Sequence, residues 1–519
     1  YLNGFDTIWI DSLNGDKYKT GKLTPEGESD PSAFSTDRNR EGIQVGTAIT
    51  TMVRTAKHKD PAKIFYRDFW GVGKLKELLQ FGRKWTKRKY LRVEPIRELG
   101  LPFRLMRTTE GYTAWPLLPD VFPTYFNGVQ TGRDDVVVEI DRSTLEERMD
   151  AYFDKSISDE EMRRISRRSM EDTMRFSAVT TRRALQKRGK LVDSFVRFAY
   201  RPFDTRWLYW ASETKLLDEK RAEYFPHVFV GNTWFSAVQQ NRKEYDSPIV
   251  HPILGCRHLI ERGANVFPML LKEETNGHTL FGEENDRKCH ELGEHCANLS
   301  DKAVEYLRSR GKIKATPNLF FHTLAMLHAP QYAVENADAL RQDWPRVPLP
   351  NEAKLLKSSG ELGRMVADLL DPEKPVAAVT SGKPRSELRT IGLFTRVGGG
   401  RIQSHSDFAV TAHWGIAGKG GICMPSTGRL VERDYTGEER ESIGDHVTQL
   451  GEKTFDIYIN ETAYWSNVPR RVWEYTLGGY QVLKKWLSYR ESALLGRALK
   501  LEEMEYFGHV VRRIAVSKD

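Results

Sequence analysis

Apolar side chains near the start of the chain follow the period of β-strands. Residues 5–11 and 64–70 are short apolar runs, and apolar positions recur at every second residue along residues 43–53. Leucines with helical spacing between residues 75 and 79 predict a helix that starts at about Lys74. We therefore expect a strand, a long mobile loop rich in glycine and lysine, a hairpin of two strands, and a helix.

The next part of the chain, from about residue 83 to residue 190, is strongly charged and predicts helices. Ser158 is followed three residues later by Glu161, a spacing that is typical of a capping box at a helix start. Ser143 or Thr144, which precede two glutamates, predict a second helix start. We interpret this part as a spacer of helices.

From residue 194 the pattern changes to short aromatic runs separated by turn residues, which predicts mostly β-structure. Later segments have helical periodicity, including two amphipathic stripes near the C-terminus. The expected strands are residues 195–200, 206–210, 227–230, 234–238, 249–253 and 455–459, and the expected helices include residues 301–308, 353–370, 480–487 and 501–514.

The length and composition of the chain exclude several classes of protein. With 519 residues it exceeds the ~250 to 300 residues that one core supports, so we expect two or three domains. Hydrophobic residues make up 39% of the chain and aromatic residues 11%, which excludes general disorder. No run approaches the roughly 20 apolar residues of a spanning helix, so no membrane is expected. Four cysteines in so long a chain predict free thiols and a reducing cytoplasm.

Positive charge is concentrated in one segment of the sequence. The whole chain has a formal net charge of +8, and residues 163–197 alone contain eleven basic and three acidic residues. A second basic cluster, residues 83–92, carries Trp85 and Tyr90 among its charges. Such a mixture suits a phosphate backbone, although a solvated helix face is an equally good interpretation.

The sequence contains no motif of a self-sufficient enzyme. It has no Gly-x-x-x-x-Gly-Lys-Ser/Thr loop, no His-Glu-x-x-His and no Gly-x-Ser-x-Gly. The glycine-rich residues 398–400 and 418–421 lack the spacing of a phosphate loop and are interpreted as turns. A Cys-His pair at 289–290 and a His-Cys pair at 295–296 have no matching second half, so a surface loop is favoured over zinc and no metal is expected.

Two segments are candidates for contact with a ligand. In residues 201–210 (RPFDTRWLYW) the aromatic side chains should anchor a β core, while Arg201 and Arg206 either pair with Asp204 or face a ligand. The second segment is a polar turn whose Gln and Asn can bond adenine bidentately and whose Arg can bond guanine, with an ordinary turn as the alternative. This turn consists of Gln239, Gln240, Asn241, Arg242 and Lys243.

Several stretches resemble Type ISP restriction-modification enzymes, in which helicase, methyltransferase and specificity domain share one polypeptide. Residues 5–15 (FDTIWIDSLNG) and 42–49 (GIQVGTAI) are similar to the later motifs of adenine-specific DNA amino-methyltransferases. Residues 201–210, 344–350 (WPRVPLP) and 472–491 (VWEYTLGGYQVLKKWLSYRE) resemble the target-recognition region. The resemblance covers nearly all of the chain.

The resemblance implies a division of labour. The methyltransferase flips an adenine out of the duplex and transfers a methyl group from S-adenosylmethionine to its N6, while the recognition domain selects the site. The family's glycine-rich cofactor motif and its Asn-Pro-Pro-Tyr motif are missing from this sequence, so no catalytic or cofactor-binding residue is assigned and this chain alone should not methylate DNA. Relatives often carry an aromatic residue just before the GIQ-like strand, where this chain has Arg-Asn-Arg-Glu at 38–41.

The chain begins without an initiator Met or a signal peptide, and we expect it to be the C-terminal piece of a longer protein. Upstream methyltransferase, helicase and nuclease domains of the same polypeptide would then be its partners, together with double-stranded DNA. The alternative is a non-catalytic scaffold or interaction module whose basic face binds nucleic acid nonspecifically. Sequence preference separates the two.

Pattern and resemblance together predict an α/β fold combined with a mixed α+β part. Residues 1–80 would be the closing strands of a Rossmann-like methyltransferase sheet, and residues 81–193 a basic helical spacer that grips phosphates. Residues 194–519 would form a β-rich target-recognition domain with C-terminal helices. The predicted DNA contacts are Lys17, Lys19, Lys22, Arg182, Arg183, Arg206, Gln239, Gln240, Asn241, Arg242 and Lys243.

Overall fold

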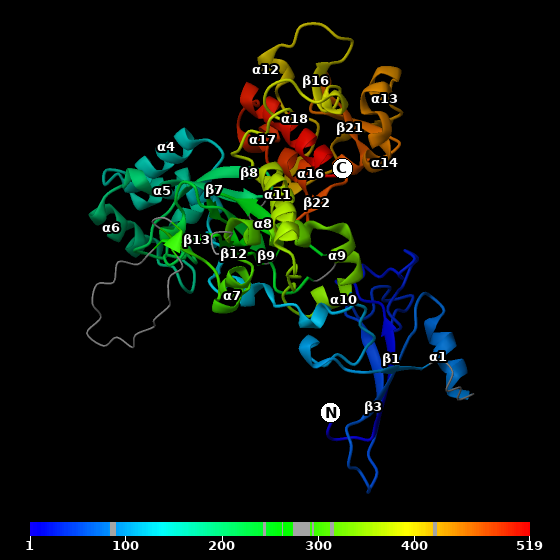
Figure 1. Cartoon of the computed structure of the whole chain (residues 1–519). Coiled ribbons are helices and arrows are strands. Elements are labelled where there is room, and N and C mark those ends of the chain that lie inside the picture. The colour runs from blue at the N-terminus through cyan, green and yellow to red at the C-terminus, as the bar shows by residue number, and fades with distance from the viewer. Residues whose placement is uncertain are drawn as a thin grey trace. The chain divides into compact units, whose positions relative to one another are not determined.

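The computed structural model of the chain consists of two compact units whose segments alternate along the sequence (Figure 1). The first unit comprises Tyr1–Leu118, Gln239–Tyr245 and Ala329–Pro348, and the second comprises Pro119–Val238, Asp246–His328 and Leu349–Asp519. The predicted domain bounds 1–80, 81–193 and 194–519 stay a prediction. The structure describes residues 1–83, 90–241, 245–261, 263–272, 291–292, 295–311, 316–418 and 423–518.

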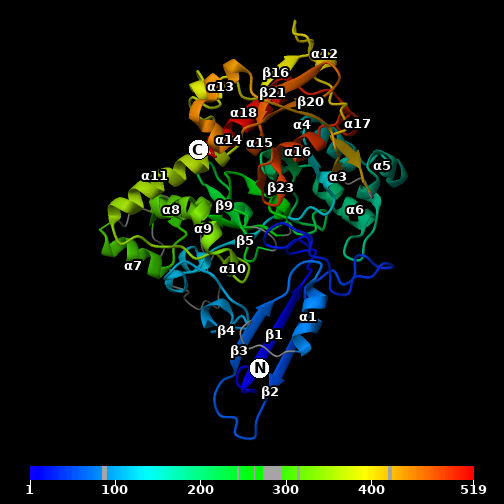
Figure 2. The same cartoon turned by 90° about the vertical axis from the view of Figure 1, so that its right-hand side faces the viewer.

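A four-stranded sheet forms the centre of the first unit. Its strands are β1 (Thr7–Asn14), β2 (Thr47–Val53), β3 (Lys63–Asp68) and β4 (Leu91–Val93), and the helices of the unit are α1 (Lys74–Arg83), α9 (Pro330–Glu335) and α10 (Ala337–Leu340). The sheet has the order β2-β1-β3-β4, and β1 pairs antiparallel with β2 and parallel with β3 (Figure 2). The predicted strands and helix are confirmed, but the predicted hairpin is wrong because β1 lies between β2 and β3.

The core of the first unit is built on the parallel pair of strands. Ile8 of β1 and Ile64 of β3 are register partners, and both side chains are almost completely buried, together with Val93 of β4. Strand β2 has nearly all of its residues exposed, and Ile49 is 46% exposed. The alternation that predicted β2 therefore marks an extended strand and not a buried face of this unit.

The second unit contains several small sheets. Three of its sheets have four strands each, in the orders β10-β9-β12-β5, β11-β7-β8-β6 and β16-β21-β20-β19. The strands are β5 (Phe126–Asn127), β6 (Val138–Glu139), β7 (Phe195–Arg201), β8 (Asp204–Tyr209), β9 (Trp234–Ala237), β10 (Ile249–His251), β11 (Leu254–Gly255), β12 (Asn265–Pro268), β13 (Leu270–Lys272), β14 (Glu291–Leu292), β15 (His295–Ala297), β16 (Leu393–Arg396), β17 (Gly415–Ala417), β18 (Cys423–Pro425), β19 (Arg429–Arg433), β20 (Thr454–Tyr458), β21 (Ala463–Pro469), β22 (Thr476–Leu477) and β23 (Tyr480–Gln481).

The residues predicted as a helical spacer also contain short strands. Strands β5 and β6, which precede residue 194, pair with β12 and β8, which follow it. The first half of the predicted spacer also has few helical residues, and its longer helices begin only at Arg142. Backbone hydrogen bonds of β5 and β6 thus join residues before 194 to residues after it. The charge pattern of the sequence does not reveal such pairing.

Helices of the second unit cover its sheets and include the amphipathic segments of the sequence. The bounds are α2 (Leu118–Val121), α3 (Asp134–Val137), α4 (Arg142–Phe153), α5 (Asp159–Ile165), α6 (Ala178–Arg188), α7 (Asp301–Ser309), α8 (Thr316–His328), α11 (Ala353–Leu370), α12 (Ser404–Asp407), α13 (Gly437–Ile443), α14 (Val447–Leu450), α15 (Arg470–Trp473), α16 (Val482–Ser488), α17 (Ser492–Leu495) and α18 (Leu501–Val516). The predicted helices at 301–308, 353–370, 480–487 and 501–514 are confirmed. The expected strand at 227–230 is wrong, because His227 ends a short 3₁₀ turn and residues 228–230 follow it without pairing.

Of the two helix starts predicted from capping residues in the charged region, one is confirmed and one is not. Ser158 caps α5 as predicted, and its Oγ accepts a hydrogen bond from the backbone N–H of Glu161 at 3.2 Å. Helix α4 begins earlier than Ser143, and the residue before it, Asp141, makes no capping bond. The carboxylate of Asp141 is instead paired with Arg497 at 2.7 Å, so a tertiary ion pair replaces the local cap.

Helices α8 and α11 pack against each other through glycine. A Cβ atom at Gly363 of α11 would lie 1.8 Å from the carbonyl oxygen of Phe321 on α8, and one at Gly360 would lie 2.9 Å from that of Asn318. Only glycine therefore permits this separation of the two backbones. Within the described part of the chain, no helix combines the length and the apolar character needed to cross a membrane.

Candidate nucleic-acid interface

The lysine-rich loop between β1 and β2 is anchored by a carboxylate. One oxygen of Asp16 accepts backbone hydrogen bonds from Tyr18 and Lys19 at 2.7 and 2.8 Å, and the other accepts one from Gly46 at 2.9 Å. Burial opposes ionisation of this group, but the backbone donors outweigh it and lower the pKa of Asp16. Both ends of the loop are thus fixed at the same carboxylate.

A buried ion pair fixes the middle of the same loop. Asp30 is fully buried and accepts hydrogen bonds from the backbone of Gly15 and Gly71 and from Lys74 Nζ at 2.7 Å. Lys74, at the start of α1, also donates to the carbonyl of Leu13 at 2.7 Å. The loop is therefore fastened to the end of β1 and to the start of α1.

The three lysines of the loop differ in their environments. Lys17 and Lys22 share the carboxylate of Glu41 at 3.2 and 3.3 Å, and hydrogen bonds from both lysines lower the pKa of Glu41. Lys19 is exposed and forms no ion pair in the described part of the chain. Lys17 and Lys22 are thus paired with a carboxylate within 4 Å, and Lys19 is the predicted phosphate contact on this loop that is not.

Phe34 is a surface aromatic residue that sequence reasoning missed. Its side chain is 55% exposed, and its backbone N–H and that of Ile43 both donate to Ser32 Oγ at 3.2 Å. A Cβ atom at Gly42 would lie 3.0 Å from the carbonyl carbon of Phe34. The fold therefore brings an exposed aromatic residue next to the start of the GIQ-like stretch, although it lies several residues earlier in the sequence.

The predicted base-reading turn is anchored within the first unit. Gln239 and Gln240 are exposed, and their amide groups donate to the Asp343 carboxylate at 2.9 Å and to the Gln342 carbonyl at 2.6 Å. Asn241 is buried and its amide donates to a backbone carbonyl of α10, so it does not face a ligand. Arg242 and Lys243 lie outside the described residues.

Most of the basic segment 163–197 is neutralised by residues from elsewhere in the fold. Its ion-paired members are Arg164, Arg167, Arg168, Arg182, Arg188, Lys190 and Arg197, and their partners are Glu160, Glu171, Asp135, Asp159, Glu213, Asp150 and Glu373. Only Glu171 among these partners belongs to the segment itself. Arg175, Arg183 and Lys187 are exposed and have no ion pair among the described residues. Residues 84–89 of the second basic cluster lie outside the described residues, and Arg92 of that cluster pairs with Glu94 at 3.0 Å.

Arg182 was predicted to contact DNA, and the structure corrects this. Its side chain is 2% exposed, and its guanidinium pairs with Asp159 at 2.7 Å and donates to the carbonyl of Tyr152 at 2.9 Å. Further bonds go to backbone carbonyls between α4 and α5. With its donors used inside the protein, Arg182 holds these helices together and offers nothing to a phosphate. Arg183, the next residue of α6, is exposed and stays a candidate.

Arg206 is likewise structural, because it belongs to a buried ion cluster. The carboxylate of Asp204 is 1% exposed and accepts two hydrogen bonds from Arg206, at 3.0 and 2.8 Å, and one from Arg490 at 3.0 Å. Burial opposes ionisation, but the two guanidinium groups outweigh it and lower the pKa of Asp204. Residues 201–210 and 472–491, which carry the family resemblance, therefore meet in the core through opposite charges.

The third resembling stretch, 344–350, is also structural. Arg346 is 9% exposed, and its guanidinium donates to the backbone carbonyls of Glu98, Thr113 and Trp115 at 2.7 to 3.1 Å. These bonds lie within the first unit and satisfy carbonyl groups of an irregular segment. Arg346 thus stabilises an irregular segment of the first unit.

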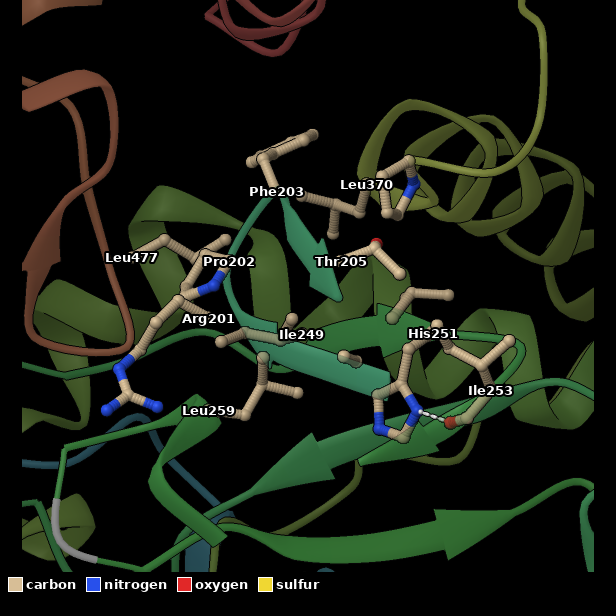
Figure 3. A pocket seen from close by; sticks show the side chains of 13 residues that line it. Arg201, Pro202, Phe203, Thr205, Ile249, His251, Ile253, Leu259, Leu370 and Leu477 are labelled. Carbon is tan, nitrogen blue, oxygen red and sulfur yellow. Dashed lines mark hydrogen bonds between the residues drawn. The ribbon is translucent and has the colours of Figure 1, made fainter. Parts of the chain in front are cut away.

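A small pocket in the second unit is mainly apolar and carries no hydrolase chemistry (Figure 3). His251 at its edge has Nδ1 2.7 Å from the carbonyl of Ile253, so this nitrogen donates and Nε2 accepts from Ser236 Oγ at 2.8 Å. Burial lowers the pKa of His251 to about 4. Ser236 is completely buried, and a carbonyl stands where a triad needs a carboxylate, so the pair is a core hydrogen bond.

No metal centre is present in the part of the chain that the structure describes. That part holds no group of three or more His, Cys, Asp or Glu side chains able to bind a metal ion. Residues 289–290 and 419–421, from the weak zinc pattern and one glycine-rich turn, lie outside the described residues. Cys256 and Cys423 are free thiols, as predicted, but Cys296 is disulfide-bonded, so the prediction of free thiols is wrong for that residue. The expectation of a protein without a metal stays a prediction.

Residues 120–505 match the family model described as the Type ISP C-terminal specificity domain. The match spans more than half of the chain, and the chain belongs to this family. No curated protein matches the sequence.

Three solved structures share the fold at low sequence identity. They are the cryo-EM structure of a DrdV–DNA complex (17% identity, TM-score 0.54), a nuclease-deletion mutant of the Type ISP restriction-modification enzyme LlaGI with a DNA substrate mimic (15%, 0.54), and the ATP-dependent Type ISP enzyme LlaBIII bound to DNA (14%, 0.56). The matches cover 99%, 99% and 100% of this chain but 47%, 42% and 30% of those chains. This chain therefore spans less than half the length of each, and the likeness shows a mixed α/β fold.

Proposed function

We propose that this chain selects the DNA sequence on which a Type ISP restriction-modification enzyme methylates adenine at N6. The match of residues 120–505 to a specificity domain carries the proposal. Support comes from the three structures with this fold, each described as a complex with DNA or a DNA mimic. S-adenosylmethionine would bind in the parent enzyme and not to residues of this chain, where its motifs are missing.

In this proposal the first unit contributes the closing strands of a Rossmann-like methyltransferase sheet. The parallel pair of β1 and β3, followed directly by α1, supports this assignment because parallel strands with a following helix are typical of such folds. The lysine loop then lies on the methyltransferase side, with Lys19 and its neighbours near phosphates. Phe34 supplies an exposed ring on which an extruded base can stack.

Phosphate and base contacts fall to different residues. Exposed cations without ion-pair partners in the described part, Arg175, Arg183 and Lys187, fix the register on the duplex without reading its sequence. Gln239 and Gln240 are the described residues best suited to base edges, because both are exposed and a bond from each amide to the protein orients it.

Replacing Gln240 by Ala should relax the preference at one base pair of the recognised site. A bidentate amide–adenine pair discriminates by about 1–3 kcal/mol, so affinity for the preferred site should fall by roughly tenfold or more while binding to random duplex is unchanged. Competition binding with single-base variants of the site measures this. Gln331→Ala is the matched control, since Gln331 is exposed in the same unit and bonded to Glu335. An unchanged preference profile would remove Gln240 from the reading set.

The methyltransferase part of the proposal is tested with the natural full-length protein and with this chain alone. Each is incubated with duplex DNA and S-adenosylmethionine, and N6-methyladenine is mapped by sequencing. The full-length protein should methylate adenine within one short motif, and this chain alone should methylate none. Methylation by this chain alone, or the absence of N6-methyladenine with the full-length protein, would contradict the proposal.

A further inference from the structure

Arg201, at the end of β7 in the second unit, is a cation without an ion-pair partner among the residues that the structure describes. Its Nη1 donates to the carbonyl of Tyr200 at 2.6 Å and lies 3.6 Å from the thiol of Cys256. Its Nε is buried and has no hydrogen-bond partner. No carboxylate forms an ion pair with it in the described part of the chain. A desolvated guanidinium with one carbonyl and one thiol is under-satisfied for its five donors.

Other buried arginines of this chain show what a satisfied guanidinium looks like. Arg206 and Arg490 share the carboxylate of Asp204. Arg346 donates to three backbone carbonyls, and Arg513 to four. Each of these therefore has either a counter-ion or several acceptors, and Arg201 has neither. Arg201 therefore has donors left over for an acceptor that comes from a bound molecule.

Two tyrosine rings hold the Arg201 side chain at the edge of the core. Its guanidinium carbon is 4.2 Å from the ring centre of Tyr200 and 5.4 Å from that of Tyr480. The hydroxyl of Tyr480 donates to the carbonyl of His258, whose side chain is exposed. In Figure 3 the Arg201 side chain extends away from the apolar residues of the pocket. The group is thus rigidly held, only partly buried, and directed away from the core.

We propose that Arg201 binds a backbone phosphate of DNA, an inference that rests on the proposed function. A phosphate oxygen pair fits the planar fork of a guanidinium, and the bond is stronger where water is partly excluded. The tyrosine walls fix the direction of the fork before DNA arrives. Because Arg201 is the first residue of the stretch 201–210, which meets residues 472–491 at Asp204, this contact sets the position of the recognition region on the duplex and carries no base preference.

The test replaces Arg201 by Gln, which keeps much of the packing and removes the charge. Binding to the preferred duplex and to a random duplex is measured over a range of salt concentrations. Loss of one phosphate contact should reduce the slope of log K against log [salt] by about 0.9 and weaken binding to both duplexes by the same factor, about tenfold at low salt. Arg440→Gln is the control, because it removes one exposed cation that is already paired with Glu452 at 3.0 Å, and its slope should not change.

An Arg201→Gln chain with the wild-type unfolding midpoint and an unchanged slope would overturn the inference. If this variant does not fold, the inference is tested on the wild-type chain. A dicarbonyl reagent modifies solvent-accessible arginines, and mass spectrometry identifies each modified residue. Arg201 should react in the free chain and be protected by duplex DNA but not by the same concentration of inorganic phosphate. No reaction, no protection, or equal protection by free phosphate would contradict a DNA contact. If the wild-type chain bound preferred and random duplexes equally well, the proposed function would be contradicted. The change in salt slope caused by Arg201→Gln would still test the phosphate contact.

Discussion

Asp204→Asn should lower the free energy of unfolding of the second unit by about 3–5 kcal/mol. The substitution keeps the shape of the side chain but removes the charge that Arg206 and Arg490 share. Arg206 would then stay in the core without its counter-ion, and Arg490 would keep only Glu503, whose carboxylate lies 3.6 Å from its Nε. Because Asp204 joins residues 201–210 to residues 472–491, the loss should spread to α16 and β8.

Local hydrogen exchange measures this effect best, because the chain folds as two units and a single unfolding midpoint mixes them. Amides of β7 and β8 should lose protection in the variant, and those of β1 should not. A double-mutant cycle with Arg206→Met isolates the pair: the double variant should be more stable than the two single costs added together predict. Strict additivity, or a cost below about 1 kcal/mol for Asp204→Asn, would show that the cluster is not a stabilising core element.

The same variant should change the pH dependence of stability. The pKa of Asp204 is lowered in the folded state, so its contribution is fully present above the unfolded value of about 3.9 and is lost as the pH falls through the folded value. The difference in stability between wild type and Asp204→Asn should therefore be constant near neutral pH and shrink below about pH 4. A difference that grows on acidification would have the wrong sign.

The second large effect is expected at the buried pair of the first unit. Asp30→Asn should destabilise the sheet of β1 to β4 by about 3–5 kcal/mol, because Lys74 is left charged and buried with only the Leu13 carbonyl as a partner. Hydrogen exchange of β1 and α1 reports the loss, and the amides of β8 are the internal control. The double variant Asp30→Asn with Lys74→Met should recover part of the stability, since neither charge remains.

This pair also connects stability to the lysine loop. Asp30 is bonded to Gly15 at the start of the loop and to Gly71 just before α1, so its loss frees the loop that carries Lys19. If the loop contacts DNA, Asp30→Asn should weaken binding to preferred and random duplexes alike. Wild-type protection in β1 after the substitution would contradict the structural role of the pair.

The sequence predicted the helices whose burial follows from the spacing of apolar residues within the helix itself. The stripe of Leu501, Met504 and Phe507 predicted α18, and the run at 353–370 predicted α11 with its bounds, because burial of one helix face needs no distant partner to be visible. Strand pairing was not predictable in this way. Apolar runs predicted β2 and β3 but not that β1 separates them, since register and order depend on residues far apart in the sequence.

Charge was the least reliable guide to the interface. Counting basic residues along 163–197 predicted a phosphate-binding face, yet carboxylates brought in by the fold neutralise most of them. Arg182 and Arg206 are buried for the same reason. The sequence offers Arg201 and Arg206 alike as partners of Asp204 or of a ligand. Only the fold shows that Arg206 pairs with the carboxylate, whereas Arg201 has no ion pair among the described residues.

Binding of the purified chain to a randomised duplex pool, at low and at near-physiological salt, tests the central claim most directly. The retained DNA is sequenced at both salt concentrations. A specificity domain should enrich one short asymmetric motif that contains adenine, and the enrichment should survive the higher salt, where nonspecific phosphate binding fades. Retention without any enriched motif, lost as salt rises, would contradict the account and leave a module that binds nucleic acid nonspecifically.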